Sequence, residues 1–213
     1  MAVRVPFRDR RDAAAQLAES LLHLAARKPL VLAIPRGGVP LGEVLARRLG
    51  GELDIVLVRK LGAPGQPELA VGAIDEGGWS WVAPHAARCG ADEGWLRRER
   101  ARQLALLHAR RELYTPGRAR ADLSGRTVIV VDDGLATGAT MLAALHAARE
   151  RHPAWLVCAV PVASAQALAL VRPLADETVC LEAPESLTAV GLQYLSFPQV
   201  DDDEVVRALR VPA

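Results

Sequence analysis

The chain is poor in lysine, aromatic residues and cysteine. Only two of its 26 basic residues are lysines, Lys28 and Lys60, and aromatic residues fill 4% of its 213 positions. The three cysteines, Cys89, Cys158 and Cys180, form no closely spaced pair, which argues against a disulfide framework or a zinc site. The formal net charge of +1 gives no strong field for a polyanion such as DNA, so we expect no nucleic-acid partner.

Long apolar runs are also missing. No stretch approaches the ~20 apolar residues of a membrane span, and Met1–Arg11 carries charge where a signal peptide needs an apolar run. We therefore expect a cytoplasmic protein with no membrane partner. Since 51% of its residues are apolar, the chain is long enough for one well-buried core but short for two. One domain over residues 1–213 is the prediction.

Buried-strand patterns alternate with helix patterns along the sequence. Short uninterrupted apolar runs are typical of strands buried on both faces, and apolar residues spaced by three and four are typical of helices. The predicted strands are 30–34, 54–58, 127–131, 155–160 and 177–181, and the predicted helices are 12–27, 41–49, 92–114, 139–149 and 166–171. The alternation predicts an α/β fold, a mostly parallel twisted sheet with helices on both faces. Ligands of such sheets bind beyond the C-terminal strand ends.

An insertion and a small C-terminal unit are expected in addition. The runs 69–74 and 79–82 flank a polar, glycine-rich connection at 75–78, which predicts a β-hairpin. With the glycine- and proline-rich segment 61–67 before it and the long helix after it, we expect an insertion at 61–118 that includes a flexible loop. Residues 182–213 would form a hood. Trp79 and Trp81 share one face of the hairpin by their spacing, which hints at a homodimer.

The loop between strand 127–131 and helix 139–149 carries the functional prediction. Its residues are Asp132, Asp133, Gly134, Leu135, Ala136, Thr137, Gly138, Ala139 and Thr140. Free amides at a helix start favour a phosphate, threonine hydroxyls can add donors, and glycines let a ligand approach the backbone. Two adjacent carboxylates can accept both hydroxyls of a vicinal diol. The loop therefore predicts a site for ribose 5-phosphate.

Other phosphate loops fit this segment less well. The GxxxxGK[ST] loop requires a lysine that is missing here, and the dinucleotide pattern GxGxxG does not occur in the loop. The segment instead resembles the phosphoribosyl pyrophosphate (PRPP) motif of type I phosphoribosyltransferases, in which four apolar residues, two acids and a short Gly/Thr loop lead into a helix. The resemblance implies that Asp132 and Asp133 hold the ribose hydroxyls and that residues 135–140 wrap the 5-phosphate.

The same resemblance implies a pyrophosphate site on two other loops. The turn Pro35-Arg36-Gly37-Gly38 follows the first predicted strand, and in the family this position forms a pyrophosphate loop, often with a strained or cis peptide. Arg36 and Gly37 would then contact the leaving group, with the unusual bond expected between them. Lys60, next to the predicted flexible loop, would lie near the pyrophosphate.

The reaction implied is transfer of the 5-phosphoribosyl group from PRPP to a nitrogen acceptor, a nucleobase, as in nucleotide salvage, with release of pyrophosphate. Mg²⁺ would be carried by PRPP, with no metal held directly by the protein. Tyr194 and Phe197 are weak candidates for contact with the acceptor. A noncatalytic PRPP-binding regulator is the alternative from another class, because fold and loop alone do not guarantee chemistry. A phosphohydrolase with Asp132 as nucleophile fits less well, since such enzymes usually open on a DxD pattern.

Overall fold

The central layer is a parallel sheet. The computed structural model describes residues 7–210, so the first six and last three positions of the predicted domain, including most of the segment searched for a signal peptide, lie outside the described residues. Five strands lie in the order β2-β1-β6-β7-β8 and all their pairings are parallel. They are β1 (Leu30–Ala33), β2 (Glu52–Ile55), β6 (Thr127–Val131), β7 (Trp155–Val162) and β8 (Glu177–Glu182). The predicted α/β class is confirmed.

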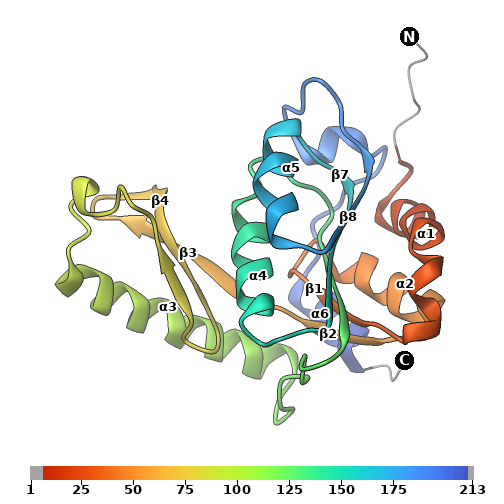
Figure 1. The fold of residues 1–213 in the computed structure, drawn as a ribbon, viewed down its shortest axis with the longest axis horizontal. Helices are drawn as coiled ribbons and strands as arrows, with labels where there is room; N and C mark the ends of the chain where they lie inside the picture. The colour runs from red at the N-terminus through yellow and green to blue at the C-terminus, as the bar shows by residue number, and fades with distance from the viewer. Residues whose placement is uncertain (1–6, 211–213) are drawn as a thin grey trace.

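Helices cover both faces of this sheet. They are α1 (Arg10–Ser20), α2 (Val39–Leu49), α4 (Ala139–Arg149), α5 (Ala165–Val171) and α6 (Asp202–Arg210). Because neighbouring residues of a strand point to opposite faces, Val31 and Val157 pack with α1, α2 and α6, whereas Leu32 and Cys158 pack with α4 and α5. Figure 1 shows α4 and α5 on one side of the sheet and α1 and α2 on the other.

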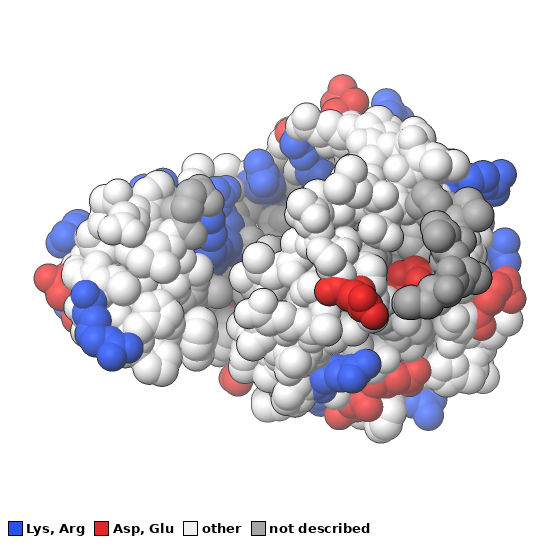
Figure 2. Space-filling view, turned by 90° about the horizontal axis from the view of Figure 1, so that it is seen from above, with Lys and Arg blue, Asp and Glu red and all other residues white. Residues whose placement is uncertain are grey.

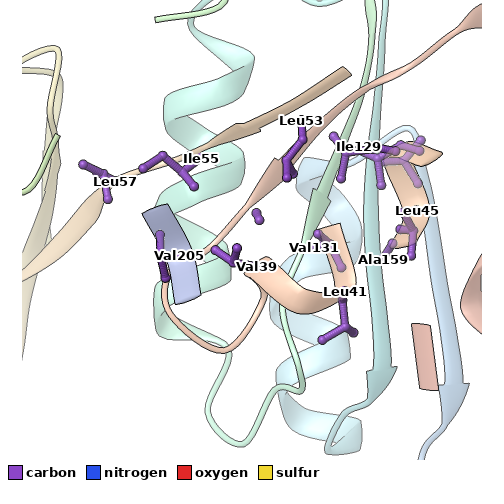
Figure 3. Packing of buried hydrophobic residues seen from close by; sticks show 14 of the residues in the cluster. Val39, Leu41, Leu45, Leu53, Ile55, Leu57, Ile129, Val131, Ala159 and Val205 are labelled. Atoms are coloured by element: carbon purple, nitrogen blue, oxygen red, sulfur yellow. The ribbon is translucent and has the colours of Figure 1, made fainter. Parts of the chain in front are cut away.

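The α2 side of the core is built from aliphatic side chains of several elements. Figure 3 shows Leu41 and Leu45 of α2 near Ile129 and Val131 of β6, and it shows Val205 of α6 beside the start of α2. All five are fully buried. Burial of such side chains contributes about 1.5–3 kcal/mol each. This layer therefore fixes the start of α2, which directly follows the Arg36 turn, against the end of β6.

The predicted helix 12–27 is divided in two. Asp9 caps α1 by accepting the N–H of Asp12 at 2.8 Å, but α1 ends at Ser20 and a 3-10 helix, η1 (Leu22–Arg27), follows. Lys28 then adopts a left-handed conformation with φ 46° before the chain enters β1. The three-and-four spacing of apolar residues continues through both segments, which is why the sequence pattern merged them.

An arm, residues 58–114, projects from the sheet (Figure 1). It consists of an antiparallel three-stranded sheet and one long helix. Its elements are β3 (Val58–Ala63), β4 (Gln66–Asp75), β5 (Ser80–Val82), the 3-10 helix η2 (Ala87–Cys89) and α3 (Glu93–Tyr114). The predicted hairpin is confirmed by the β4–β5 pairing, in which Ala73 lies opposite Trp81.

Two expectations for the start of the arm were wrong. The predicted strand 54–58 is not one element, because the parallel strand β2 ends at Ile55 and Val58 begins the antiparallel β3. The predicted flexible loop 61–67 is the end of β3, a tight turn and the start of β4, with Leu61 opposite Gly72. Gly65, at φ 70°, supplies the left-handed residue of that turn.

A buried ion-pair network joins the arm to the sheet. Arg111 of α3 donates to Asp54 Oδ1 at 2.9 Å, to Glu76 Oε2 at 2.6 Å and to the carbonyl of Ile55 at 2.8 Å. The side chains of Asp54 and Glu76 are 2% and 5% exposed. Trp79 also stacks on His146 of α4, with ring centroids 5.6 Å apart. The arm root is therefore fixed to the core by charge and by ring packing.

The N-terminal segment pairs with the tail of the chain. Phe7 N–H donates to Gln193 O, and Leu195 N–H donates to Phe7 O, each at 2.8 Å. The tail segment, residues 193–200, begins at the last residue of the short 3-10 helix η4 (Val190–Gln193) and precedes α6. Phe7 and Tyr194 also pack against each other with ring centroids 5.5 Å apart. This pairing brings the first turn of α1 and the tail segment to the same edge of the sheet as the 132–140 loop.

Candidate functional site

The 132–140 loop is fastened to the neighbouring strand at its centre. Leu135 N–H donates to Val162 O at 2.9 Å, and Ser164 N–H donates to Leu135 O at 3.0 Å. The side chain of Leu135 is 3% exposed. Leu135 therefore supports the loop, and its amide, predicted to wrap a phosphate, is already bonded to β7.

The next three amides are free to bind an anion. Within the described chain, no protein acceptor takes the N–H groups of Ala136, Thr137 or Gly138. Gly138 has φ 77°, a conformation that favours glycine, and directs the chain into α4. Thr137 and Thr140 are exposed. Free amides at the positive end of a helix dipole form an anion site, so this part of the loop has the predicted geometry.

The two acids at the start of the loop are held by polar contacts. Asp132 Oδ1 accepts the N–H of Asp133 at 2.9 Å. Asp133 Oδ2 accepts Arg10 Nε at 2.9 Å, and Tyr194 Oη donates to the backbone carbonyl of Asp133 at 2.6 Å. Burial raises the pKa of both carboxyls, and the charge of Asp133 raises the pKa of Asp132 further, whereas Arg10 opposes the rise at Asp133. The pair therefore favours a ligand that supplies hydroxyl donors.

The Arg36 turn lies directly against Asp133. A Cβ added to Gly37 would be 2.1 Å from Asp133 Oδ2, so only glycine fits without movement. A cis peptide bond is present in this turn, between Pro35 and Arg36, one bond before the predicted position. Arg36 Nη1 lies 3.8 Å from Asp202 Oδ1 at the start of α6. The turn and Asp133 thus lie against each other, and the contact of Arg36 and Gly37 with a leaving group stays a prediction.

A cavity of about 340 Å³ opens between these groups. Its lining residues are Arg10, Arg36, Gly37, Asp133, Phe197, Pro198, Gln199 and Val200. It combines two guanidinium groups, one carboxylate and one aromatic ring. The cavity is large enough for a planar ring and some of its substituents, and it lies where the acid pair, the Arg36 turn and the tail segment meet.

The remaining predicted residues fall in different places. Phe197 lines the cavity. Tyr194 is only 6% exposed, and its hydroxyl donates to the backbone carbonyl of Asp133, so Tyr194 supports the acid pair. Lys60 lies in β3 of the arm and is not among the cavity residues. Its predicted contact with pyrophosphate stays a prediction.

Sequence reasoning missed the role of Arg10. This residue is 8% exposed and contacts Asp133 across 123 positions of the chain. Arg10 is one of many arginines in the sequence, and no local pattern assigns it a partner. The contact is visible only after folding.

Residues 7–210 lack two features of other protein classes. No group of three or more His, Cys, Asp or Glu side chains there could hold a metal ion, and no helix among residues 7–210 combines the length and apolarity needed to cross a bilayer. Figure 2 shows basic and acidic side chains interspersed on the face seen from above, with no continuous basic surface there.

Fold and loop define an α/β protein in which a loop with unbonded amides leads into a helix at the C-terminal edge of a parallel sheet. The phosphoribosyl transferase domain model matches residues 7–195. The chain therefore belongs to the phosphoribosyl transferase domain family.

Individual relatives agree with this assignment. Two curated Mycobacterium tuberculosis proteins, provisionally named phosphoribosyl transferases, are each 43% identical over 204 residues, which is 95% of this chain and 46% of their length. The chain thus spans about half the length of these relatives. A crystal structure of a Thermus thermophilus protein is 50% identical with a TM-score of 0.86, covering 96% of this chain and 97% of that one.

The fold extends to more distant structures. A Neisseria gonorrhoeae protein with 15% identity has a TM-score of 0.53 and covers 97% of this chain and 98% of its own. At that identity the likeness shows the fold alone.

Proposed function

We propose that this chain binds PRPP together with Mg²⁺ and transfers its 5-phosphoribosyl group to a nitrogen acceptor, a nucleobase, with release of pyrophosphate. The observation that carries the proposal is the layout of the 132–140 loop. Free amides at Ala136–Gly138 stand at one end of it, and the paired acids Asp132 and Asp133 stand at the other. Ribose 5-phosphate presents a phosphate and a vicinal diol that match these two ends.

The Arg36 turn supplies the third part of the site. PRPP bound along the loop by its phosphate and diol would extend its pyrophosphate toward the Arg36 turn, which lies against Asp133. A guanidinium offers several donors in a fixed plane, which suits pyrophosphate oxygens. Of the two cations predicted for this role, Arg36 lines the cavity, so we assign the leaving group to Arg36 first.

Catalysis in this proposal is positioning and charge stabilisation. Negative charge would grow on the pyrophosphate as the bond to C1 breaks, and the Arg36 guanidinium would stabilise it. Positive charge grows on the ribose ring, near the carboxylates of Asp132 and Asp133. The nitrogen acceptor attacks from the opposite side, with inversion at C1. Phe197 lines the cavity with the Arg10 guanidinium over its ring, and it stays a weak candidate for contact with the acceptor.

Mg²⁺ fits as a companion of the substrate. Oxygens of PRPP would be its main ligands. Bound there, it would neutralise charge on the pyrophosphate.

The test is a titration with PRPP and Mg²⁺ followed by a screen of nucleobases for pyrophosphate release. We expect wild-type binding, release with at least one base, and no turnover in the variant Asp132→Asn/Asp133→Asn. Asp122→Asn is a matched control, because Asp122 is exposed and outside the site. Near-normal turnover in the double variant would discard the assignment of these acids, and absence of PRPP binding by the wild type would discard the function.

A noncatalytic PRPP-binding regulator is the second candidate. The observation that favours it is the arm, since the segment expected to close over the substrate as a flexible loop is the paired strands β3 and β4. Tight binding of PRPP with no pyrophosphate release for any base would support this candidate.

A further inference from the structure

The side chain of Arg10 joins three parts of the site from outside the 132–140 loop. Its Nε and Nη2 atoms each lie 2.9 Å from Asp133 Oδ2, and Nη1 donates to the carbonyl of Pro198 at 2.7 Å. Its Cζ atom lies 3.6 Å from the centre of the Phe197 ring. The side chain is 10% exposed. A guanidinium buried to this degree and with this many partners has a fixed position.

Both contacts of Arg10 with the carboxylate use the same oxygen. Oδ2 of Asp133 lies between Arg10 and the backbone of Gly37, because glycine leaves the space that a Cβ would fill. Arg10 therefore holds Asp133 by Oδ2 and leaves Oδ1 to accept a hydroxyl of a ligand. This division of the two oxygens is what a carboxylate needs if it is to be both fixed in place and used for binding.

The charge of Arg10 opposes the other influences on Asp133. Burial raises the pKa of the Asp133 carboxyl, while Arg10 lowers it by its charge and its hydrogen bond. Asp132 is the neighbouring acid, Arg36 lines the same cavity, and the Tyr194 hydroxyl is bonded to the Asp133 carbonyl. In the described chain Arg10 is the cation that pairs directly with this acid.

The position of Arg10 depends on the pairing of the two chain ends. The N–H and the carbonyl of Phe7 are both hydrogen-bonded to the tail segment. Three residues later α1 begins, with Asp9 as its cap. The same tail segment supplies Pro198 and Phe197 to Arg10. Residues 7–10 are therefore held beside the site by the tail segment.

We propose that Arg10 is a positioning residue for PRPP, holding the Asp133 carboxylate by one oxygen so that the other can accept a ribose hydroxyl. The inference rests on the proposed function. It predicts that loss of the guanidinium weakens PRPP binding through Asp133.

The experiment compares Arg10→Gln with Arg11→Gln by titration with PRPP and Mg²⁺. Arg11 is the matched control, because it lies in the same turn of α1 with its side chain 58% exposed and pairs with Glu43 on α2. We expect binding about 10- to 100-fold weaker in Arg10→Gln, the usual worth of hydrogen bonds to a charged group. Arg11→Gln should bind like the wild type.

A pH series separates positioning from simple loss of structure. Removing the cation raises the pKa of Asp133, so as the pH falls, Arg10→Gln should lose PRPP binding at a higher pH than the wild type. Arg10→Lys keeps the charge but loses the planar fork, so it should bind with intermediate affinity and lose binding near the wild-type pH. It also provides a second variant if Arg10→Gln does not fold.

A double-variant cycle decides whether Arg10 acts through Asp133. If it does, Arg10→Gln should weaken binding much less in an Asp133→Asn background than in the wild type. Two results would overturn the inference. One is that Arg10→Gln binds PRPP as tightly as a wild type that binds it. The other is that Arg10→Gln weakens binding equally in the wild-type and Asp133→Asn backgrounds. Wild type that does not bind PRPP would instead overturn the proposed function, so the two failures are distinguishable.

Discussion

Gly37→Ala tests the contact between the Arg36 turn and the acid pair. The added Cβ would lie 2.1 Å from Asp133 Oδ2, 2.7 Å from its Cγ and 3.1 Å from Oδ1. Gly37 does not have a positive φ, so alanine can adopt its backbone conformation and the cost comes from this collision alone. Because Arg10 holds Oδ2, the carboxylate can move only by giving up that ion pair.

The expected cost is that of one charge-assisted contact, about 1.5–3 kcal/mol. If Asp133 binds PRPP, affinity should fall roughly 10- to 150-fold. In a chain of this size the same cost would lower the melting temperature by about 3–12 °C. Calorimetric titration with PRPP and Mg²⁺ measures the first effect, and thermal unfolding followed by circular dichroism measures the second.

Two further variants make the Gly37 result interpretable. Gly94→Ala in α3 is the matched control, since its Cβ would come no closer than 3.4 Å to another residue, and it should leave affinity unchanged and stability equal or slightly higher. Asp133→Ala removes all three atoms that the new Cβ would meet. In that background Gly37→Ala should cost less than about 0.5 kcal/mol. An equal cost in both backgrounds would refute the steric explanation.

Two other features give predictions about stability. Arg111→Met should lower the free energy of unfolding by about 3–5 kcal/mol in urea, because it leaves Glu76 buried without its paired cation and Asp54 with only Arg118, at 3.9 Å. A loss below about 1 kcal/mol would contradict this role. Burial raises the pKa of Tyr114 to about 12 and also raises that of Tyr194, and the sequence has only these two tyrosines. The folded protein should therefore show little tyrosinate absorbance near pH 10, the ordinary pKa of tyrosine. It should lose stability as the pH rises above that value. Full ionisation at about pH 10 without unfolding would show that these rings are accessible.

The segment from 127 to 149 could be predicted from the sequence to the residue. The strand 127–131 and the helix 139–149 have the limits expected. Their patterns are local, since five β-branched residues in succession favour a buried strand and the glycines of the following loop interrupt both patterns. The same loop carries the motif by which the sequence resembled the family, so the family was predicted from it, while the anion site stays a prediction.

The start of the arm could not be predicted because its hydrophobic pattern is continuous. Ile55, Val56, Leu57 and Val58 form one apolar run in the sequence, yet β2 ends at the first of them and β3 begins at the last. Val56 and Leu57 are buried between the two sheets, so no polar residue marks the change of strand direction. The glycines and prolines after Leu61 suggested a loop, whereas one tight turn accommodates them.

Arg10 and the use of Tyr194 could not be predicted for another reason. Both depend on the pairing of residues 7–8 with the tail segment, which joins opposite ends of the chain. An arginine near the start of a sequence with many arginines has no local feature that predicts its partner. Tyr194 was expected to contact the acceptor, but its hydroxyl donates a hydrogen bond to the backbone carbonyl of Asp133.

The fastening of Leu135 to β7 has a consequence for binding thermodynamics. The two backbone hydrogen bonds of Leu135 give the loop its shape before any ligand arrives. A preorganised loop loses little conformational entropy on association, so more of the intrinsic interaction energy appears as affinity. Association with a phosphate should therefore be fast and carry a small entropic penalty from this loop, and slow rearrangement, if observed, would have to come from the segments that surround it.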